Sequence, residues 1–269
     1  MRTIAATVLA VIALLIPLSV GAQIDPYLRQ KQKQILYPTV IVVAGNSVGA
    51  GSVIYSDKRM VMQDGVPTQI LDTFVVTNKH VVQSAIEAGV PVQVGWTHYD
   101  SDFRVTGVLW KIADVIGVDQ GGQDIALLRL HDHENQIPFV ARVAPKGVRV
   151  EVLERVWTIG STVGQPPFYS EGVLNGKDLY FPGGMRLMRM SMFAHRGSSG
   201  GPLFHFDVVR GYEIFGIVTA IYRGPTGEKK ADGSLVMEEM GNISYALPFE
   251  VIHEFLEKAG LALGIDFFK

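Results

Sequence analysis

Three segments of the sequence each place a chemically reactive side chain at the end of an apolar run. They are residues 74–82, which contain His80, residues 124–130, which begin with Asp124, and residues 196–203, which contain Ser199. Hydrolysis of an amide by serine needs a hydroxyl, a base that takes its proton, and a carboxylate that fixes the tautomer of the base. Each residue alone is more often a turn or cap residue, but together they predict nucleophilic catalysis.

Glycines surround the candidate nucleophile. Gly197 stands two residues before Ser199, and Gly200 and Gly201 follow it. Because glycine has no Cβ, the main chain at Gly197 can approach a substrate closely and donate its N–H to a developing oxyanion. Gly200 and Gly201 permit a tight chain path after the nucleophile.

The elements that would position these residues are mostly short strands. Runs of β-branched residues recur between Gly, Asp and Pro from Pro38 onward, a pattern typical of an all-β sandwich or barrel. Helices are expected over residues 80–88 and over residues 248–259, where Gly260 acts as the stop. Two polar stretches, residues 56–72 and 223–241, are expected to form long loops.

Composition excludes several functional classes. The chain has 269 residues, with 24 Lys and Arg against 26 Asp and Glu, and 48% of its residues are apolar. This near-neutral charge gives no broad attraction to phosphate backbones, so nucleic acid is not an expected partner. The sequence contains no cysteine, which excludes disulfides, cysteine nucleophiles and zinc sites built on thiolates.

The N-terminal residues differ from the rest of the chain. Arg2 precedes an uncharged run over residues 4–20, and Val20-Gly21-Ala22 is typical of a signal cleavage site, so residues 1–22 predict a signal peptide. The alternative is a membrane anchor formed by residues 4–20, because about 17–25 apolar residues span a bilayer. In both cases we expect an exported protein, periplasmic or extracellular, and a membrane contact only if the segment is retained.

The order of His80, Asp124 and Ser199 and the segments around them resemble the trypsin-like (chymotrypsin-fold) serine peptidases, especially their HtrA/Deg branch. The stretches that carry this resemblance are residues 76–82, 124–128, 159–161, 170–173, 196–201, 216–220 and 243–248. The resemblance covers residues 38–260. It divides the chain into a signal peptide (1–22), a loosely packed lead-in (23–37), a peptidase domain (38–260) and a tail (261–269).

The resemblance implies an all-β fold of two antiparallel six-stranded β-barrels with a C-terminal helix, and an active site between the barrels. In that arrangement Ser199 is the nucleophile, His80 is the general base and then the acid, and Asp124 orients His80. The N–H groups of Gly197 and Ser199 form the oxyanion hole. The implied activity is endopeptidase cleavage of polypeptides through an acyl-enzyme, without a cofactor or metal.

Two departures from the family pattern limit these expectations. Ser198 stands where zymogen-activated trypsins have an Asp that pairs with a new N-terminal ammonium, so no trypsin-style zymogen switch is expected. HtrA/Deg proteins usually continue into a PDZ domain, but only residues 261–269 follow the terminal helix here. Functions of such a domain are therefore not expected. Trimers occur in that branch, but the lead-in gives no specific signal for an oligomer.

Specificity is expected to differ from that of trypsin. Phe193 occupies the position, six residues before the nucleophile, where trypsins place an Asp that selects Arg or Lys. The resemblance suggests an apolar primary pocket that favours small or medium aliphatic residues, with Tyr222 limiting its depth. The residues expected to bind substrate are Phe193, Ala194, Thr219, Ala220, Ile221 and Tyr222.

Three other interpretations compete with this one. Residues 197–201 match the Gly-x-Ser-x-Gly turn of α/β-hydrolases, with Asp232 and His253 as acid and base, but Gly200-Gly201-Pro202 is poor material for the helix that fold requires. A catalytically inactive trypsin-fold interaction module would have the same motifs. Residues 131–134, His-Asp-His-Glu, have a spacing that can hold zinc, although a solvated turn explains them better.

Overall fold

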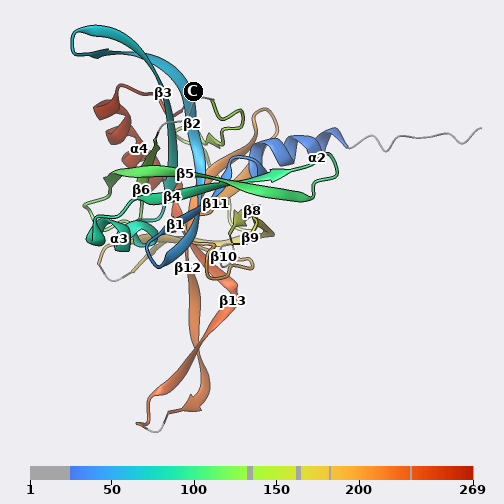
Figure 1. The fold of residues 1–269 in the computed structure, drawn as a ribbon. Coiled ribbons are helices and arrows are strands. Elements are labelled where there is room, and N and C mark those ends of the chain that lie inside the picture. The colour runs from blue at the N-terminus through green and yellow to red at the C-terminus, as the bar shows by residue number, and fades with distance from the viewer. Residues whose placement is uncertain (1–24, 132–135, 162–164, 182, 231, 269) are drawn as a thin grey trace, which may run out of the picture.

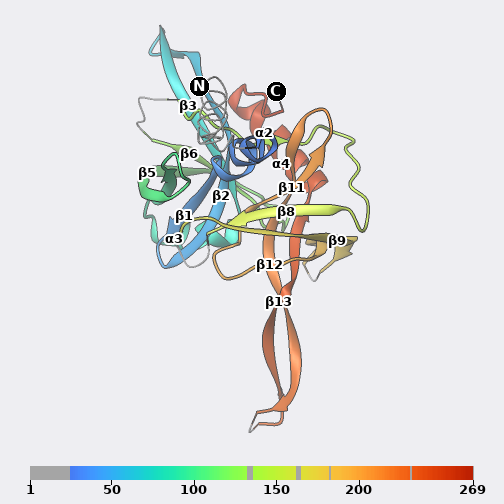
Figure 2. The same ribbon diagram turned by 90° about the vertical axis from the view of Figure 1, so that its right-hand side faces the viewer.

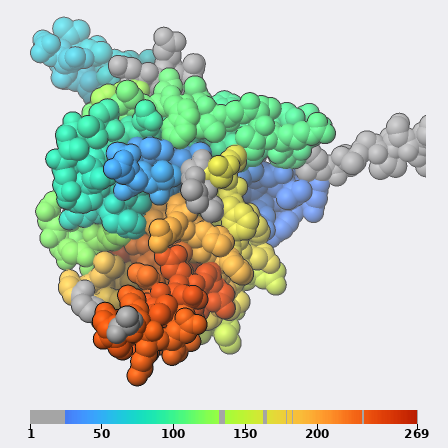
Figure 3. All heavy atoms as spheres, turned by 60° about the horizontal axis from the view of Figure 1, so that its bottom comes forward, coloured from blue at the N-terminus to red at the C-terminus, as the bar shows by residue number. Residues whose placement is uncertain are grey.

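Two β-barrels packed side by side form the body of the protein (Figures 1 and 2). The computed structural model describes residues 25–131, 136–161, 165–181, 183–230 and 232–268. The space-filling view shows the N-terminal half, blue to green, against the C-terminal half, yellow to orange (Figure 3). The chain therefore builds one barrel after the other, and the expected site lies where they meet.

The first barrel is closed and antiparallel, with strand order β1-β2-β3-β6-β5-β4. The strands are β1 (Thr39–Ala44), β2 (Ser47–Gln63), β3 (Val66–Thr77), β4 (Val92–Tyr99), β5 (Val105–Val118) and β6 (Ala126–Leu130). Its interior is filled mainly by β-branched side chains, including Val40, Val53, Val75 and Val94, which are fully buried or nearly so. Such side chains pack well on a pleated surface, which is why these runs form strands.

The second barrel has strand order β11-β8-β9-β10-β13-β12, and pairing of β11 with β12 closes it. Its strands are β8 (Arg155–Gly160), β9 (Phe168–Tyr180), β10 (Arg186–Ser191), β11 (Pro202–Asp207), β12 (Gly211–Lys229) and β13 (Leu235–Pro248). A short strand, β7 (Arg142–Val143), adds to β12 in parallel. The expectation of two six-stranded antiparallel barrels is confirmed.

A hydrophobic cluster shared by both barrels holds them together. It contains Phe74 and Leu127 from the first barrel, Phe204 from the second, and Ile252 from the C-terminal helix, all fully buried. Complete burial of a Phe or Leu side chain stabilises the fold by about 1.5–3 kcal/mol. The relative position of the barrels, on which any site between them depends, is therefore set by packing.

Two helices lie where helical character was expected. They are α3 (Lys79–Ala88) and α4 (Phe249–Leu263). The expected stop at Gly260 is wrong, because α4 continues to Leu263 and ends at Gly264, whose φ is 66°. Gly260 is needed for a different reason: a Cβ there would lie 2.5 Å from the carbonyl oxygen of Ile265, where the chain folds back on the helix.

The two stretches expected to be loops are instead long β-hairpins. Residues 56–72 extend β2 and β3 in register (the first arm), and residues 223–241 extend β12 and β13 (the second arm); Figure 1 shows the arms pointing away from the body. In the first arm, Asp64 and Gly65 both have positive φ, 51° and 80°, as a type I′ hairpin turn requires. The Asp-Gly pair is the sequence signal for this hairpin, and the expectation of a loop did not take it into account.

The lead-in is helical and docked rather than loosely packed. It consists of α2 (Pro26–Lys31) and a π-helical turn (Gln32–Leu36), and Ile35 is buried in the cluster shared by the barrels. The Asp25 side chain caps α2 and Pro26 occupies its first turn, a start signal that the sequence already contained. The predicted signal peptide lies outside the described residues. Within them, no helix is long and apolar enough to cross a membrane.

Candidate active site

His80 lies in the first turn of α3, directly after the end of β3. Its backbone N–H donates to Asp124 Oδ1 at 2.8 Å, and its Nδ1 lies 2.6 Å from Asp124 Oδ2. Asn78 reinforces this arrangement, because its side-chain amide donates to the carbonyl oxygen of Asp124 at 2.7 Å. The pairing holds Nδ1 toward the carboxylate and leaves Nε2 as the nitrogen available for proton transfer.

Asp124 is almost fully buried, with 8% of its surface exposed. Burial alone would raise its pKa, but hydrogen bonds to His80 and from the Thr219 hydroxyl outweigh burial and lower the pKa below the usual value for Asp. The carboxylate is therefore ionised at neutral pH. Thr219 belongs to the second barrel, so this carboxylate receives hydrogen bonds from both barrels.

Ser199 lies in a turn of the second barrel that presses against the first. Its carbonyl oxygen accepts a hydrogen bond from Ala50 N at 2.7 Å. Gly200 has φ of 84°, and a Cβ there would lie 2.1 Å from the carbonyl oxygen of Ala50, so only glycine fits. The Ser199 hydroxyl donates to the carbonyl oxygen of Thr219 at 3.4 Å. In the part of the chain that the structure describes, no hydrogen bond joins Ser199 to His80.

The turn before Ser199 leaves two backbone donors free. Ser198 N donates to the carbonyl of His195 at 2.9 Å, and Gly197, at the third position of this turn, has φ of 94° as a type II turn requires. The carbonyl of Gly197 accepts from Ser161 N at 3.2 Å, which fixes the orientation of the peptide. Among the described residues, the N–H groups of Gly197 and Ser199 have no acceptor.

A comparison with protein families identifies the family of this chain. The family described as "Trypsin-like peptidase domain" matches residues 49–209, more than half of the chain and a range that contains His80, Asp124 and Ser199. The chain is a member of the trypsin-like peptidase family.

Two similar proteins are both described as "Magnetosome formation protease MamE". The protein of Paramagnetospirillum magneticum is 32% identical over 157 residues, which are 56% of this chain and 19% of that protein. The protein of Magnetospirillum gryphiswaldense is 28% identical over 211 residues, 70% of this chain and 25% of that protein. This peptidase chain thus spans about a quarter or less of the length of these relatives.

Solved structures agree on the fold of this trypsin-like peptidase. The crystal structure of Deg5 has a TM-score of 0.56 at 19% identity and covers 84% of this chain and 90% of that one. The MamO protease domain from Magnetospirillum magneticum, in its apo form, has a TM-score of 0.53 at 18% identity and covers 82% and 96%. The expected resemblance to trypsin-like peptidases, including a Deg protein, is confirmed at the level of family and fold.

The residues expected to bind substrate have four different surroundings. Ala194 and Ile221 pack with one hydrophobic cluster of the second barrel, whereas Ala220 and Tyr222 pack against the cluster shared by the barrels. The Thr219 side chain points to Asp124. Phe193 is 56% exposed, and its ring lies 5.7 Å from the His195 ring. Packing into a hydrophobic cluster does not place a residue relative to a substrate, so the substrate-binding role of these six residues stays a prediction.

Sequence reasoning missed the functional contacts of Thr219 and Gln123. Thr219 falls at an irregularity of β12, between residues paired with Ala246 and Tyr245, so simple alternation gives the wrong direction for its side chain. Gln123 immediately precedes Asp124, and its amide bridges to the β9–β10 turn: Nε2 donates to Gly184 O at 3.0 Å, and Oε1 accepts from Arg186 N at 3.1 Å. No motif marked it.

The α/β-hydrolase interpretation does not fit this fold. Asp232 lies at the tip of the second arm and accepts from Ser234, while His253 is buried on α4 beside Glu257, so they do not form an acid–base pair. The α/β-hydrolase alternative is wrong. Of residues 131–134, only His131 is described, and it pairs with Asp114.

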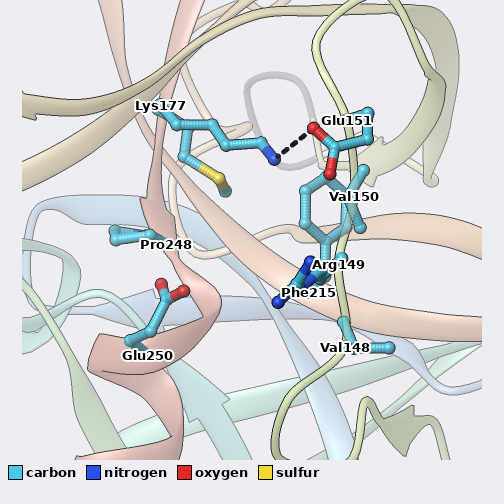
Figure 4. A pocket seen from close by; sticks show the side chains of 9 residues that line it. Val148, Arg149, Val150, Glu151, Lys177, Phe215, Pro248 and Glu250 are labelled. Atoms are coloured by element: carbon cyan, nitrogen blue, oxygen red, sulfur yellow. Dashed lines mark hydrogen bonds and ion pairs between the residues drawn. The ribbon is translucent and has the colours of Figure 1, made fainter.

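A cavity of about 330 Å³ lies among residues of the second barrel and the segments that flank it (Figure 4). Its lining includes Glu151, Lys177, Phe215 and Glu250, none of them expected in catalysis. Lys177 Nζ pairs with Glu151 at 3.3 Å across the opening, so these two charges neutralise each other. None of the predicted catalytic residues lines this cavity.

Proposed function

We propose that this protein is a serine endopeptidase that cleaves polypeptides through an acyl-enzyme on Ser199. The observation that carries the proposal is the position of Thr219 among the three predicted catalytic residues. Its carbonyl accepts from the Ser199 hydroxyl, its own hydroxyl donates to Asp124, and Asp124 pairs with His80. Residues far apart in the sequence thus meet at one seam, as triad chemistry requires.

The reaction follows from the groups at this seam. Ser199 Oγ attacks the carbonyl carbon of the scissile peptide and gives its proton to His80 Nε2, while Asp124 stabilises the imidazolium that forms. The oxyanion accepts hydrogen bonds from the free N–H groups of Gly197 and Ser199. His80 then protonates the leaving amine, the acyl-enzyme forms, and water activated by His80 releases the acid and restores Ser199.

Before attack, the Ser199 hydroxyl must leave the carbonyl of Thr219 and turn toward His80. The bond that it gives up is long, 3.4 Å, and therefore weak. This resting contact also favours the second candidate function, a trypsin-fold interaction module without turnover. The two differ in whether Ser199 reacts at all.

The primary specificity is proposed for small or medium aliphatic residues. Phe193 replaces the acidic residue that would select a basic side chain, and the family resemblance assigns the small Ala194 and the apolar Ile221 to the primary pocket. Cleavage of a peptide library tests this: enrichment of Ala, Val or Leu before the scissile bond supports it, and a dominant Arg or Lys preference contradicts it.

We further propose that residues 1–22 direct export, so that the peptidase acts on polypeptides outside the cytoplasm, without a cofactor. Their basic start, uncharged run and small residues before Gln23 support this. Mass spectrometry of the protein recovered from outside the cytoplasm tests the export and shows whether the chain is cleaved after Ala22 or keeps residues 1–22 as a membrane anchor.

Labelling of the full chain with a fluorophosphonate probe separates the peptidase from the inactive module. The wild type should be labelled, and Ser199→Ala and His80→Ala should not. Ser234→Ala is a matched control, because Ser234 is an exposed serine on the second arm and should not affect labelling. A folded wild type that resists the probe and cleaves no peptide would establish the inactive module instead.

A further inference from the structure

The turn between β11 and β12 exposes two adjacent valines almost completely. Val208 is 89% and Val209 87% exposed, and among the described large hydrophobic residues only Leu261 is comparably open. Isolated exposed apolar residues are ordinary, but two β-branched residues side by side at a hairpin tip form an apolar projection that needs an explanation.

This projection is held rigidly outward. The Asp207 carboxylate accepts from the backbone N–H groups of Val209 and Arg210 at 2.9 and 2.8 Å. Arg210 in turn pairs with Asp207 and, at 2.7 Å, with the fully buried Glu213. The turn therefore cannot fold its valines back onto the barrel without breaking these charge-assisted hydrogen bonds.

The start of the described chain lies beside this turn. The Tyr27 ring lies 6.1 Å from the Phe206 ring, and its hydroxyl lies 2.5 Å from that of Tyr212. Further along, Gln34 accepts from Tyr212 N at 3.0 Å. Tyr27 and Leu28 are themselves about half exposed. We call Tyr27, Leu28, Val208 and Val209 the valine edge.

The sequence upstream of Asp25 suggests what covers the valine edge. The uncharged run of residues 4–20 ends only five positions before Asp25. Five residues reach at most about 17 Å even when fully extended. A bilayer that holds residues 4–20 therefore lies within that distance of Asp25 and thus close to the valine edge.

The charged residues around the valine edge also favour contact with a lipid bilayer. Arg29 and Lys33 on the lead-in and Arg142 beside the turn are exposed, whereas Arg210 is already paired with Asp207 and Glu213. Basic residues near a membrane surface are attracted to anionic headgroups. An apolar tip among basic side chains is the pattern of an interfacial membrane contact.

We propose that the valine edge rests on a lipid bilayer, with Val208 and Val209 entering its interfacial layer. The contact would fix the orientation of the peptidase on the membrane by two points, the N-terminal segment and the β11–β12 turn. It requires that residues 4–20 stay in the bilayer rather than being removed by cleavage after Ala22. It requires neither Ser199 nor His80, so it stands or fails independently of the proposed catalysis.

The absence of cysteine makes the test direct. Val208→Cys, Val209→Cys and the control Leu261→Cys are labelled singly with an environment-sensitive NBD dye in the full chain, with residues 1–22 retained. Each is placed in vesicles of phosphatidylcholine and phosphatidylglycerol. The dyes at 208 and 209 should shift to the blue, resist aqueous iodide and be quenched by nitroxide-labelled lipid, whereas the dye at 261 should remain accessible to iodide.

Equal iodide quenching at 208, 209 and 261 would overturn the proposal. Dyes at 208 and 209 that shift to the blue in vesicles but are not quenched by nitroxide-labelled lipid would show a protein–protein contact and overturn it as well. Fluorophosphonate labelling of each variant reports separately on the catalytic site.

Discussion

The acid–base half of the candidate site and its nucleophile half are organised differently. His80 and Asp124 are joined by two hydrogen bonds of 2.6 and 2.8 Å and supported by Asn78 and Thr219. Ser199 is held just as firmly through its backbone, yet its hydroxyl makes only a 3.4 Å bond to the carbonyl of Thr219. The predicted base is thus already oriented for proton transfer, whereas the hydroxyl of the predicted nucleophile is not yet directed at His80.

This difference indicates that the remaining rearrangement needed to assemble the site is at Ser199. The pair in the first barrel needs no rearrangement to accept a proton. The serine needs one side-chain rotation, which a substrate carbonyl in the oxyanion hole could favour by occupying the N–H groups of Gly197 and Ser199. Substitutions in the two halves should therefore have different signatures.

Removing the nucleophile should have the largest effect. Ser199→Ala is expected to lower kcat on a peptide substrate by on the order of 10⁶-fold, because no acyl-enzyme can form. Adding His80→Ala to this variant should cause little further loss, since the two residues act as a unit. Additive losses in the double variant would contradict a shared role.

Disturbing the prepared half should cost less. Asp124→Asn is expected to lower kcat by about 10⁴-fold. An amide offers only one acceptor oxygen to the donors from His80 and Thr219, so His80 is held in the wrong tautomer. Kinetics on a peptide substrate, with thermal unfolding as the control for folding, measure this. A loss below tenfold would mean that Asp124 does not orient His80.

A smaller effect is expected at Gln123, which ties the Asp124 loop to the second barrel. Gln123→Glu places a carboxylate oxygen against the carbonyl of Gly184, and the displaced loop should lower kcat by about tenfold to a hundredfold with little change in KM. Gln120→Glu is the matched control, because Gln120 is exposed on the same loop and should keep full activity. Equal kcat in both variants would remove Gln123 from the positioning network.

The smallest effect concerns stability rather than turnover. His205 lies in the second barrel, 3.6 Å from buried Glu213, and burial lowers its pKa below 6.5 despite that carboxylate. The His205 side chain therefore binds a proton more readily in the unfolded chain than in the folded protein. The free energy of unfolding should fall as the pH drops below about 6.5. Urea unfolding should show a shallower pH slope for His205→Asn, and His98→Asn, at an exposed strand position, should keep the wild-type slope.

The parts of the site that could be predicted are those with local signals. His80, Asp124, Ser199 and Gly197 stand in short motifs at strand ends, and hydrophobic runs identified most strands. The direction of the Thr219 side chain could not be predicted, because it depends on an irregularity in the pairing of β12 with β13. Gln123 acts through a turn more than 60 residues away, and no local pattern reports such a contact.

The arms and the lead-in were mistaken for loops for a related reason. Their residues are polar because most of their surface faces solvent, and polarity hid the strand pairing of the first arm, whose Asp64-Gly65 turn was its only strong local mark. The lead-in is helical because Ile35 finds a place in a cluster formed by residues far along the chain. Tertiary packing, rather than local preference, determines these segments.

The hydrogen bond from Ala50 to the carbonyl of Ser199 makes the reactive residue part of the joint between the barrels. Mild denaturant or heat that loosens this joint would withdraw the alcohol from its base while each set of strands is still intact. Under the proposed mechanism, turnover should therefore depend on the docking of the two barrels. It should vanish under gentler conditions than those that abolish the far-UV signal of the sheets.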